Sequence, residues 1–195
     1  MKNKNLLRLT QAALMAALSF VVFEFLRIPV SETTSIHLGN AFVVLGALLI
    51  GGVWGGLAGA VGLSAADLLA GLTLSAPKTF LLKFIMGLVA GLVAEKFLHI
   101  REKGAKDQFR IALVSSICSL GLNVVLDPIV GYFYKMYILG QPQELAATLA
   151  KISSVATLIN AAACVAVVVI LWPVLYLALK EADLLTWYEQ PKKVA

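Results

Sequence analysis

Long apolar stretches, separated by short polar or glycine-containing segments, dominate the chain. Six of them, at about residues 7–26, 40–50, 53–72, 77–97, 109–137 and 145–179, predict six helices. Most are close to or above the roughly 20 residues that a helix needs to cross a bilayer, and only the 40–50 stretch is short for a full span. The pattern predicts an all-α, polytopic membrane protein in which residues 1–195 form one transmembrane domain.

Composition supports the membrane class. The chain is 60% hydrophobic and only 14% charged, against about 25% charged residues in ordinary soluble domains. Its mean hydropathy of +0.89 leaves no stretch for a separate soluble domain. The net charge of +5 does not point to nucleic acid, because the basic residues sit at helix ends and form no amphipathic surface.

The distribution of lysine and arginine predicts the orientation in the membrane. Six spans put both termini on one side. Eleven of the 16 basic residues then lie on that side, four lie on the other, and Lys83 falls inside a span. Because cytoplasmic loops carry the excess of Lys and Arg, both termini are predicted to be cytoplasmic.

Small residues recur at four-residue spacing, which places them on one helix face and permits close helix packing. Glycines 51, 55 and 59, glycines 52 and 56, and glycines 87 and 91 are expected to pack inside the protein. Two overlapping alanine pairs on the first helix are equally compatible with internal packing and with another membrane protein. These alanines are Ala12, Ala13, Ala16 and Ala17. The two cysteines, Cys118 and Cys164, are predicted to be small buried apolar residues.

Polar side chains within the predicted spans gather in the half of the membrane away from the termini. Charged groups in lipid are costly unless paired or hydrated, so such residues are candidates for function. Polar lining confined to one half predicts a pocket open outside and closed inside, whereas a channel needs polar lining through both halves. The candidate substrate-binding residues are His37, Asn40, Lys78, Thr79, Lys83, Asn123, Asp127, Tyr134, Thr157 and Asn160.

Several of these residues also have structural interpretations. Lys83 is a candidate for an ion pair with Asp67 or Asp127, and Asp127 for a bond to the backbone freed by the proline that follows it. His37 is compatible with a solvated loop. The residues that could instead hydrogen-bond between helices are Asn123 and Asn160.

Catalytic and metal-binding signatures are missing from the sequence. It contains no HExxH or GxSxG motif, and no Walker A loop. His37 and His99 are predicted on opposite sides of the membrane, so they cannot share a metal. The chain is therefore expected to be no enzyme and to carry no metal or cofactor, and any use of ATP is expected from a partner.

Five stretches carry a more specific pattern: residues 8–20 (RLTQAALMAALSF), 36–42 (IHLGNAF), the glycine-rich 51–62, 65–71 (AADLLAG) and 76–91 (APKTFLLKFIMGLVAG). Together with six spans, they resemble the substrate-binding S components of energy-coupling factor (ECF) vitamin transporters. The resemblance is clearest over residues 8–96, and the second half is similar mainly in its pattern. It indicates the branch linked to hydroxymethylpyrimidine, pyridoxine and riboflavin.

The resemblance implies a binding subunit of an ABC-type importer in a bacterial cell membrane. In this family, small residues of the AxxxA type on helix 1 contact a membrane coupling (T) subunit, and the four alanines above match that motif. Two partner ATPases drive the cycle, and the loaded S component topples to release its vitamin inside. No nucleic-acid partner is expected.

The candidate residues also suggest a substrate. Their mixture of cation, anion, amide and tyrosine suits a small neutral heterocycle, with pyridoxine or hydroxymethylpyrimidine favoured and riboflavin as a further candidate. Asp127 is expected at a ring nitrogen or hydroxyl, and Tyr134 is expected to stack on the ring. A strongly anionic ligand would call for more arginine. The alternative function is a stand-alone, proton-coupled secondary transporter, for which neither inverted repeats nor a midplane ion site is visible.

Overall fold

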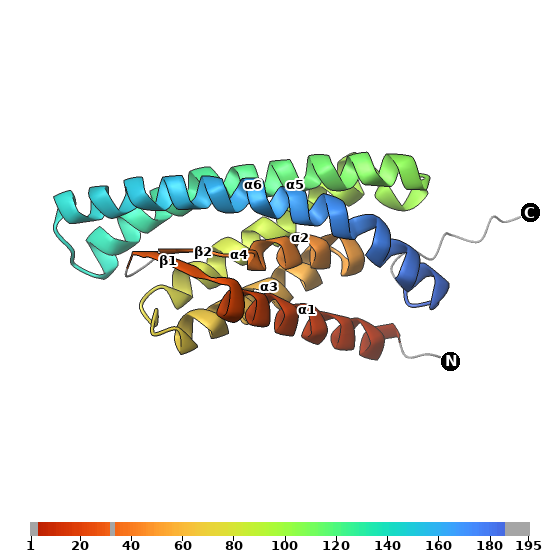
Figure 1. Cartoon of the computed structure of the whole chain (residues 1–195), viewed down its shortest axis with the longest axis horizontal. Helices are drawn as coiled ribbons and strands as arrows, with labels where there is room; N and C mark the ends of the chain where they lie inside the picture. Colours follow the sequence, from red (N-terminus) through yellow and green to blue (C-terminus); the bar gives the residue numbers. More distant parts are fainter. Residues whose placement is uncertain (1–3, 32–33, 186–195) are drawn as a thin grey trace, which may run out of the picture.

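Six α-helices form the body of the protein in the computed structural model, which describes residues 4–31 and 34–185. They are α1 (Lys4–Leu26), α2 (Gly39–Ile50), α3 (Gly52–Leu69), α4 (Ala76–Gly91), α5 (Ala105–Phe133) and α6 (Gln143–Glu181). They coincide with the six apolar stretches, so the helical prediction is confirmed. Figure 1 shows the helices lying side by side, with both ends of the described chain at the same end of the bundle.

A short hairpin follows α1, where the sequence suggested only a polar loop. Strands β1 (Ile28–Ser31) and β2 (Thr34–Ile36) pair antiparallel, with Ile28 opposite Ile36 and Pro29 opposite Ser35. We call this end of the bundle the hairpin end; the α3–α4 and α5–α6 connections also lie there (Figure 1). The opposite end, which holds the start of α1 and the end of α6, is the terminal end.

Two helices change their winding at their ends. A π-helical segment, η1 (Leu92–Phe97), extends α4, and another, η3 (Tyr134–Ile138), extends α5. A 3-10 turn, η2 (Ile100–Glu102), lies in the α4–α5 connection. A π-turn shifts the faces on which later residues lie, because it adds a residue to one turn of the helix.

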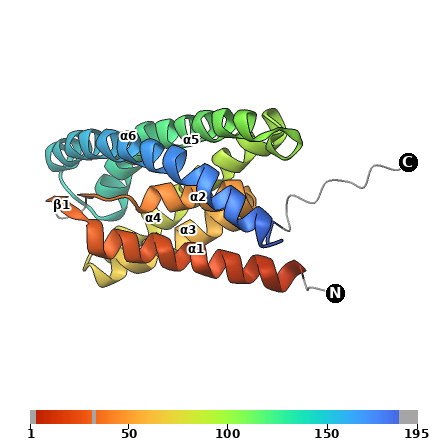
Figure 2. The same ribbon diagram turned by 45° about the vertical axis from the view of Figure 1, so that its right-hand side comes forward.

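Helix α2 is an internal helix. Its 12 residues rise only about 18 Å, short of the roughly 30 Å hydrocarbon core, and all of them except Phe42 are buried. Figure 2 shows α2 between the α5–α6 pair and α1. Of the described helices, four are long and apolar enough to span a membrane: Asn5–Leu26, Gly52–Leu69, Lys106–Ile138 and Gln143–Glu181. Six crossings and cytoplasmic termini therefore remain predictions.

Glycines bring α3 and α4 into backbone contact. A Cβ atom placed on Gly87 would lie 2.2 Å from the Cα of Gly56, and one on Gly91 would lie 2.3 Å from the Cα of Gly52. Gly55 approaches α2 just as closely, because an added Cβ would lie 2.1 Å from the backbone nitrogen of Ala47. No side chain fits at these contacts, which confirms the predicted internal packing of these glycines.

The alanines of α1 divide between two faces. Ala12 is buried in the core, and Ala16 is half-buried where its carbonyl oxygen would lie 2.3 Å from a Cβ on Gly62 of α3. Ala13 and Ala17 are exposed. The docking role of the four alanines stays a prediction, and it suits the exposed Ala13 and Ala17 better than Ala12, whose side chain is covered within this chain.

Candidate functional site

A cavity lies among side chains at the hairpin end, with about 520 Å³ of space free of protein atoms, a figure that includes open solvent beside it. Among the lining side chains that were not predicted are Phe23, Ser35 and Asp67. Tyr134, which was expected to stack on a ligand, is not among its lining residues. The predicted residues that line it are His37, Asn40, Lys78, Thr79, Lys83, Asn123, Asp127, Thr157 and Asn160.

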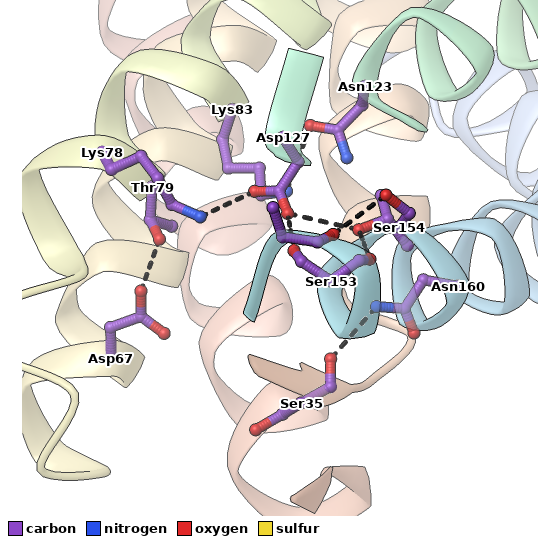
Figure 3. A network of polar contacts seen from close by, with 12 residues as sticks. Ser35, Asp67, Lys78, Thr79, Lys83, Asn123, Asp127, Ser153, Ser154 and Asn160 are labelled. Carbon is purple, nitrogen blue, oxygen red and sulfur yellow. Dashed lines mark hydrogen bonds and ion pairs between the residues drawn. The ribbon is translucent and has the colours of Figure 1, made fainter. Parts of the chain in front are cut away.

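The carboxylate of Asp127 joins three helices. The Lys78 ammonium on α4 lies 2.9 Å from its Oδ1, and the Ser153 hydroxyl on α6 donates to its Oδ2 at 2.5 Å. The Thr157 hydroxyl lies 3.2 Å from the same Oδ2. Figure 3 shows Asp127 between Lys78 and Ser153. Both carboxylate oxygens are thus occupied by side chains, and the expected bond to backbone freed by the proline is not what holds Asp127.

Lys83 has a different environment, although it comes from the same helix as Lys78. Its ammonium lies 3.4 Å from Oδ1 of Asn123, a long hydrogen bond, and it forms no ion pair with a carboxylate of the described residues. The predicted pairing of Lys83 with Asp67 or Asp127 is therefore wrong. Since an ammonium has three N–H donors, most of this buried group's capacity remains available to a ligand.

Asp67 of α3 was noted in the sequence but not included among the candidates. Its Oδ2 accepts a hydrogen bond from the Thr79 hydroxyl of α4, and its side chain is buried. This contact joins α3 to the polar half of α4, as Figure 3 shows. Its position in the half of α3 toward the hairpin end, where the other polar residues lie, could have identified it as a candidate.

The amide of Asn160 bonds to backbone rather than to a neighbouring helix. Its Oδ1 accepts from the His37 N–H at 2.9 Å, and its Nδ2 donates to the Ser35 carbonyl oxygen at 3.1 Å. Both ends of the amide are therefore engaged by the segment between β2 and α2. Of the two predicted interhelical amides, only Asn123 contacts another helix, through Lys83.

His37 is buried, with 8% of its surface exposed, so the solvated-loop interpretation is wrong. Its ring lies 4.6 Å from the Phe23 ring of α1, measured between centroids. Burial, reinforced by the Lys83 charge and opposed by Asp127, lowers the pKa of His37 to about 3. The imidazole is therefore neutral near pH 7. Its Nδ1 and the Oδ1 of Asn40 are buried without a hydrogen-bond partner in the part of the chain described.

The placement of Tyr134 follows from the way α5 packs. Asp127 and Gly131 face α4, because Asp127 pairs with Lys78 and a Cβ on Gly131 would lie 3.5 Å from Lys78 Nζ. The Nζ of Lys135 would lie 3.6 Å from the same Cβ. Lys135, which was not among the predicted site residues, is buried. Tyr134 begins the π-helical segment beside this face.

Ser153 was not among the candidate residues, and both cysteines were predicted to be buried. Ser153 shares a stripe of α6 with Thr157 and Asn160, and this spacing was the signal for its contact with Asp127. Cys164 is buried, as predicted, but Cys118 is exposed on α5, so the prediction is wrong for Cys118. The exposure of Cys118 is compatible with its apolar character, since the outer surface of a membrane helix faces lipid.

The geometry suits reversible binding of a small molecule. The cavity lining includes the Lys83 ammonium, which donates, and Asn40 and His37, which each carry a buried polar atom without a partner in the described protein. Groups of three or more potential metal ligands do not occur among the described residues. Fold and site together define a helical membrane protein with a polar cavity at one end.

Comparison with protein families identifies the family of the chain within this class. The model of the ECF-type riboflavin transporter S component family matches residues 3–180, and the chain belongs to this family. Its members are substrate-binding components of membrane transporters and not the catalytic ones. No curated protein and no solved structure matches the chain in the corresponding comparisons. The hydroxymethylpyrimidine or pyridoxine branch remains a prediction.

Proposed function

We propose that the chain captures an uncharged heterocyclic vitamin in the hairpin-end cavity, as the binding subunit of an ECF-type importer. The observation that carries the proposal is a set of incompletely satisfied polar groups on residues that line this cavity: Nδ1 of His37 and Oδ1 of Asn40, which lack partners in the described protein, and the Lys83 ammonium, whose one hydrogen bond, to Asn123, is long. Buried polar groups are costly when they lack partners, so a ligand that satisfies them binds with a large gain. A ring carbonyl or ring nitrogen suits Lys83, and a ligand N–H or hydroxyl suits Asn40.

Three substrates fit this chemistry to different degrees. The description of the matched family supports riboflavin, whose ring carbonyls would accept hydrogen bonds from Lys83. Pyridoxine and hydroxymethylpyrimidine also carry ring nitrogens and hydroxyls, and the small apolar share of the lining, Phe23, Leu63 and Leu72, favours a single ring. We propose riboflavin as the first substrate to test and the two single-ring vitamins as its competitors.

The proposal includes partners and an orientation. Membership of the family supports a membrane coupling (T) subunit and two ABC-type ATPases as partners, in a bacterial cell membrane. The excess of basic residues at the terminal end supports cytoplasmic termini and a cavity that loads from outside. The loaded subunit would then topple to release its vitamin inside.

Transport by purified components tests this function. We expect uptake of radiolabelled vitamin into proteoliposomes only when the chain is combined with the coupling subunit, both ATPases and ATP. Uptake by the chain alone, driven by a proton gradient, would support the secondary-transporter alternative and contradict the proposal.

The exposed alanines provide a separate test of partner binding. Ala13→Leu together with Ala17→Leu places bulk on the free face of α1 and is expected to prevent co-purification of the coupling subunit. Leu14→Phe adds bulk to another exposed position of α1 and serves as the matched control. Co-purification that survives in the double variant would contradict the docking role of Ala13 and Ala17.

A further inference from the structure

The carboxamide of Asn160 pairs with the chain much as a neighbouring strand would. It accepts from the His37 N–H at 2.9 Å and donates to the Ser35 carbonyl at 3.1 Å, in a position where only 5% of Asn160 is exposed. One turn further along α6, the Cys164 thiol lies 3.8 Å from the His37 carbonyl oxygen. The backbone from Ser35 to His37 is therefore held on α6 along its length.

The segment held in this way carries one of the two side chains of the cavity lining that have a buried atom without a partner in the described chain, and it leads to the other. His37 belongs to it, and Asn40 follows at the start of α2. On the other side the segment has little free space, because a Cβ on Gly39 would lie 2.6 Å from the Leu63 side chain and 3.0 Å from the Ser19 carbonyl oxygen. The location of His37 and Asn40 thus depends on how the segment sits between α3 and α6.

We propose that Asn160 is a positioning residue, which holds the Ser35–His37 backbone against α6 and so sets His37 and Asn40 toward the ligand. The inference rests on the proposed function, because it assigns Asn160 to the same cavity. It differs from the prediction that Asn160 binds the substrate directly, since both ends of its amide already have partners in the protein.

The Asn160→Asp variant distinguishes the effect of the two Asn160 hydrogen bonds, which we call the clamp, from the effect of lost packing. A neutral carboxyl can reproduce both bonds, because its carbonyl accepts from His37 and its hydroxyl donates to Ser35. A carboxylate cannot donate, and it would face the Ser35 carbonyl oxygen instead. Burial favours the protonated form, so the clamp is expected to reform as the pH falls.

Ligand affinity should follow this chemistry. Affinity is measured for whichever of riboflavin, pyridoxine and hydroxymethylpyrimidine binds to the wild-type protein. For Asn160→Ala, we expect this affinity to fall about 10- to 30-fold at both pH 7.5 and pH 5, from the loss of two hydrogen bonds. For Asn160→Asp, a similar loss at pH 7.5 should shrink to about 3-fold at pH 5. Wild-type protein and the α6 control Ser154→Ala, measured at both pH values, subtract the titration of other groups around the cavity: His37, Asp67, Lys78, Lys83, Asp127 and Cys164.

Hydrogen exchange in the ligand-free protein decides between positioning and direct contact. The His37 amide should exchange at least about 10-fold faster in Asn160→Ala than in wild type, because its acceptor is gone. Unchanged exchange of this amide, or an Asn160→Asp variant that does not recover at low pH, would overturn the inference. If wild-type protein binds none of the three vitamins, the proposed function fails, and the exchange rates still decide whether Asn160 holds the segment. Reversible recovery within one Asn160→Asp sample also excludes misfolding as the cause.

Discussion

The two halves of α4 make contrasting contacts with their neighbours. In the half toward the hairpin end, Lys78, Thr79 and Lys83 reach across to carboxylates and an amide on α3 and α5. In the other half, Gly87 and Gly91 touch the backbone of α3 directly. Only one turn separates Lys83 from Gly87. The residues of α4 that line the cavity are Lys78, Thr79 and Lys83, and none of its glycines does. Long polar side chains thus accompany the cavity, whereas the glycines accompany direct backbone contact.

The largest expected effect comes from the ion pair in the polar half. Asp127→Asn leaves the buried Lys78 ammonium without its carboxylate and should lower the free energy of unfolding by about 3–5 kcal/mol. Adding Lys78→Met should restore much of that stability, because the unpaired charge is then removed. Thermal and denaturant unfolding of both single variants and the double variant in detergent measures this cycle. Equal stabilities of Asp127→Asn and wild type would show that the pair does not hold α4 to α5.

The glycine half should respond almost as strongly to a single methyl group. Gly87→Ala places a Cβ 2.2 Å from the Gly56 Cα, so α3 and α4 must separate, at an expected cost of about 3 kcal/mol. The control is Gly121→Ala on α5, where an added Cβ has nothing within 4 Å and helix propensity favours alanine. Unfolding temperatures of the two variants provide the comparison, and similar values for both would contradict the close α3–α4 contact.

Lys83 separates binding from stability within the polar half. Lys83→Met should weaken vitamin binding about 100-fold, through the loss of charged hydrogen bonds of about 1.5–3 kcal/mol. Unlike Asp127→Asn, it should leave the unfolding temperature unchanged or raised, because Lys83 has no ion pair to lose in the described protein. Lys151→Met removes an exposed lysine of α6 as the control. A variant that binds normally, or one that unfolds as Asp127→Asn does, would refute this distinction.

The smallest expected effect concerns the protonation of His37. Its pKa in the folded protein is about 3, below the ordinary 6.5, so an unfolded chain takes up a proton that the folded chain does not as pH falls below 6.5. Stability is therefore retained above pH 6.5 and should decrease by about 2 kcal/mol between pH 7 and pH 5 through this group. His37→Gln should remove that part of the pH dependence, as measured by unfolding at the two pH values. A variant with the same pH dependence as wild type would show that the folded protein accepts the proton.

Much of the architecture follows from local patterns in the sequence. The lengths of the apolar stretches locate all six helices, and four-residue glycine spacing anticipates the α3–α4 contact, because both depend on the helical repeat alone. The concentration of polar residues in one half of the spans also anticipates most of the cavity lining. These features need no knowledge of how distant segments align.

The details that could not be predicted from the sequence depend on how the helices are aligned with one another in the folded protein. Whether Lys78 or Lys83 pairs with Asp127 differs by little more than one helical turn, and both arrangements satisfy the pattern. Asn160 has backbone partners more than 120 residues away, at Ser35 and His37. Tyr134 starts a π-turn, which no repeat in the sequence marks. Partner choice within a polar cluster therefore requires the packed structure.

Equilibrium binding to the purified chain tests the central claim most directly. Riboflavin, pyridoxine and hydroxymethylpyrimidine would each be titrated calorimetrically into wild-type protein and the Lys83→Met and Lys151→Met variants. We expect saturable one-site binding of one of these vitamins, retained in Lys151→Met and lost in Lys83→Met. Absence of binding by wild-type protein to all three, or equal binding by Lys83→Met, would contradict a vitamin site in the hairpin-end cavity.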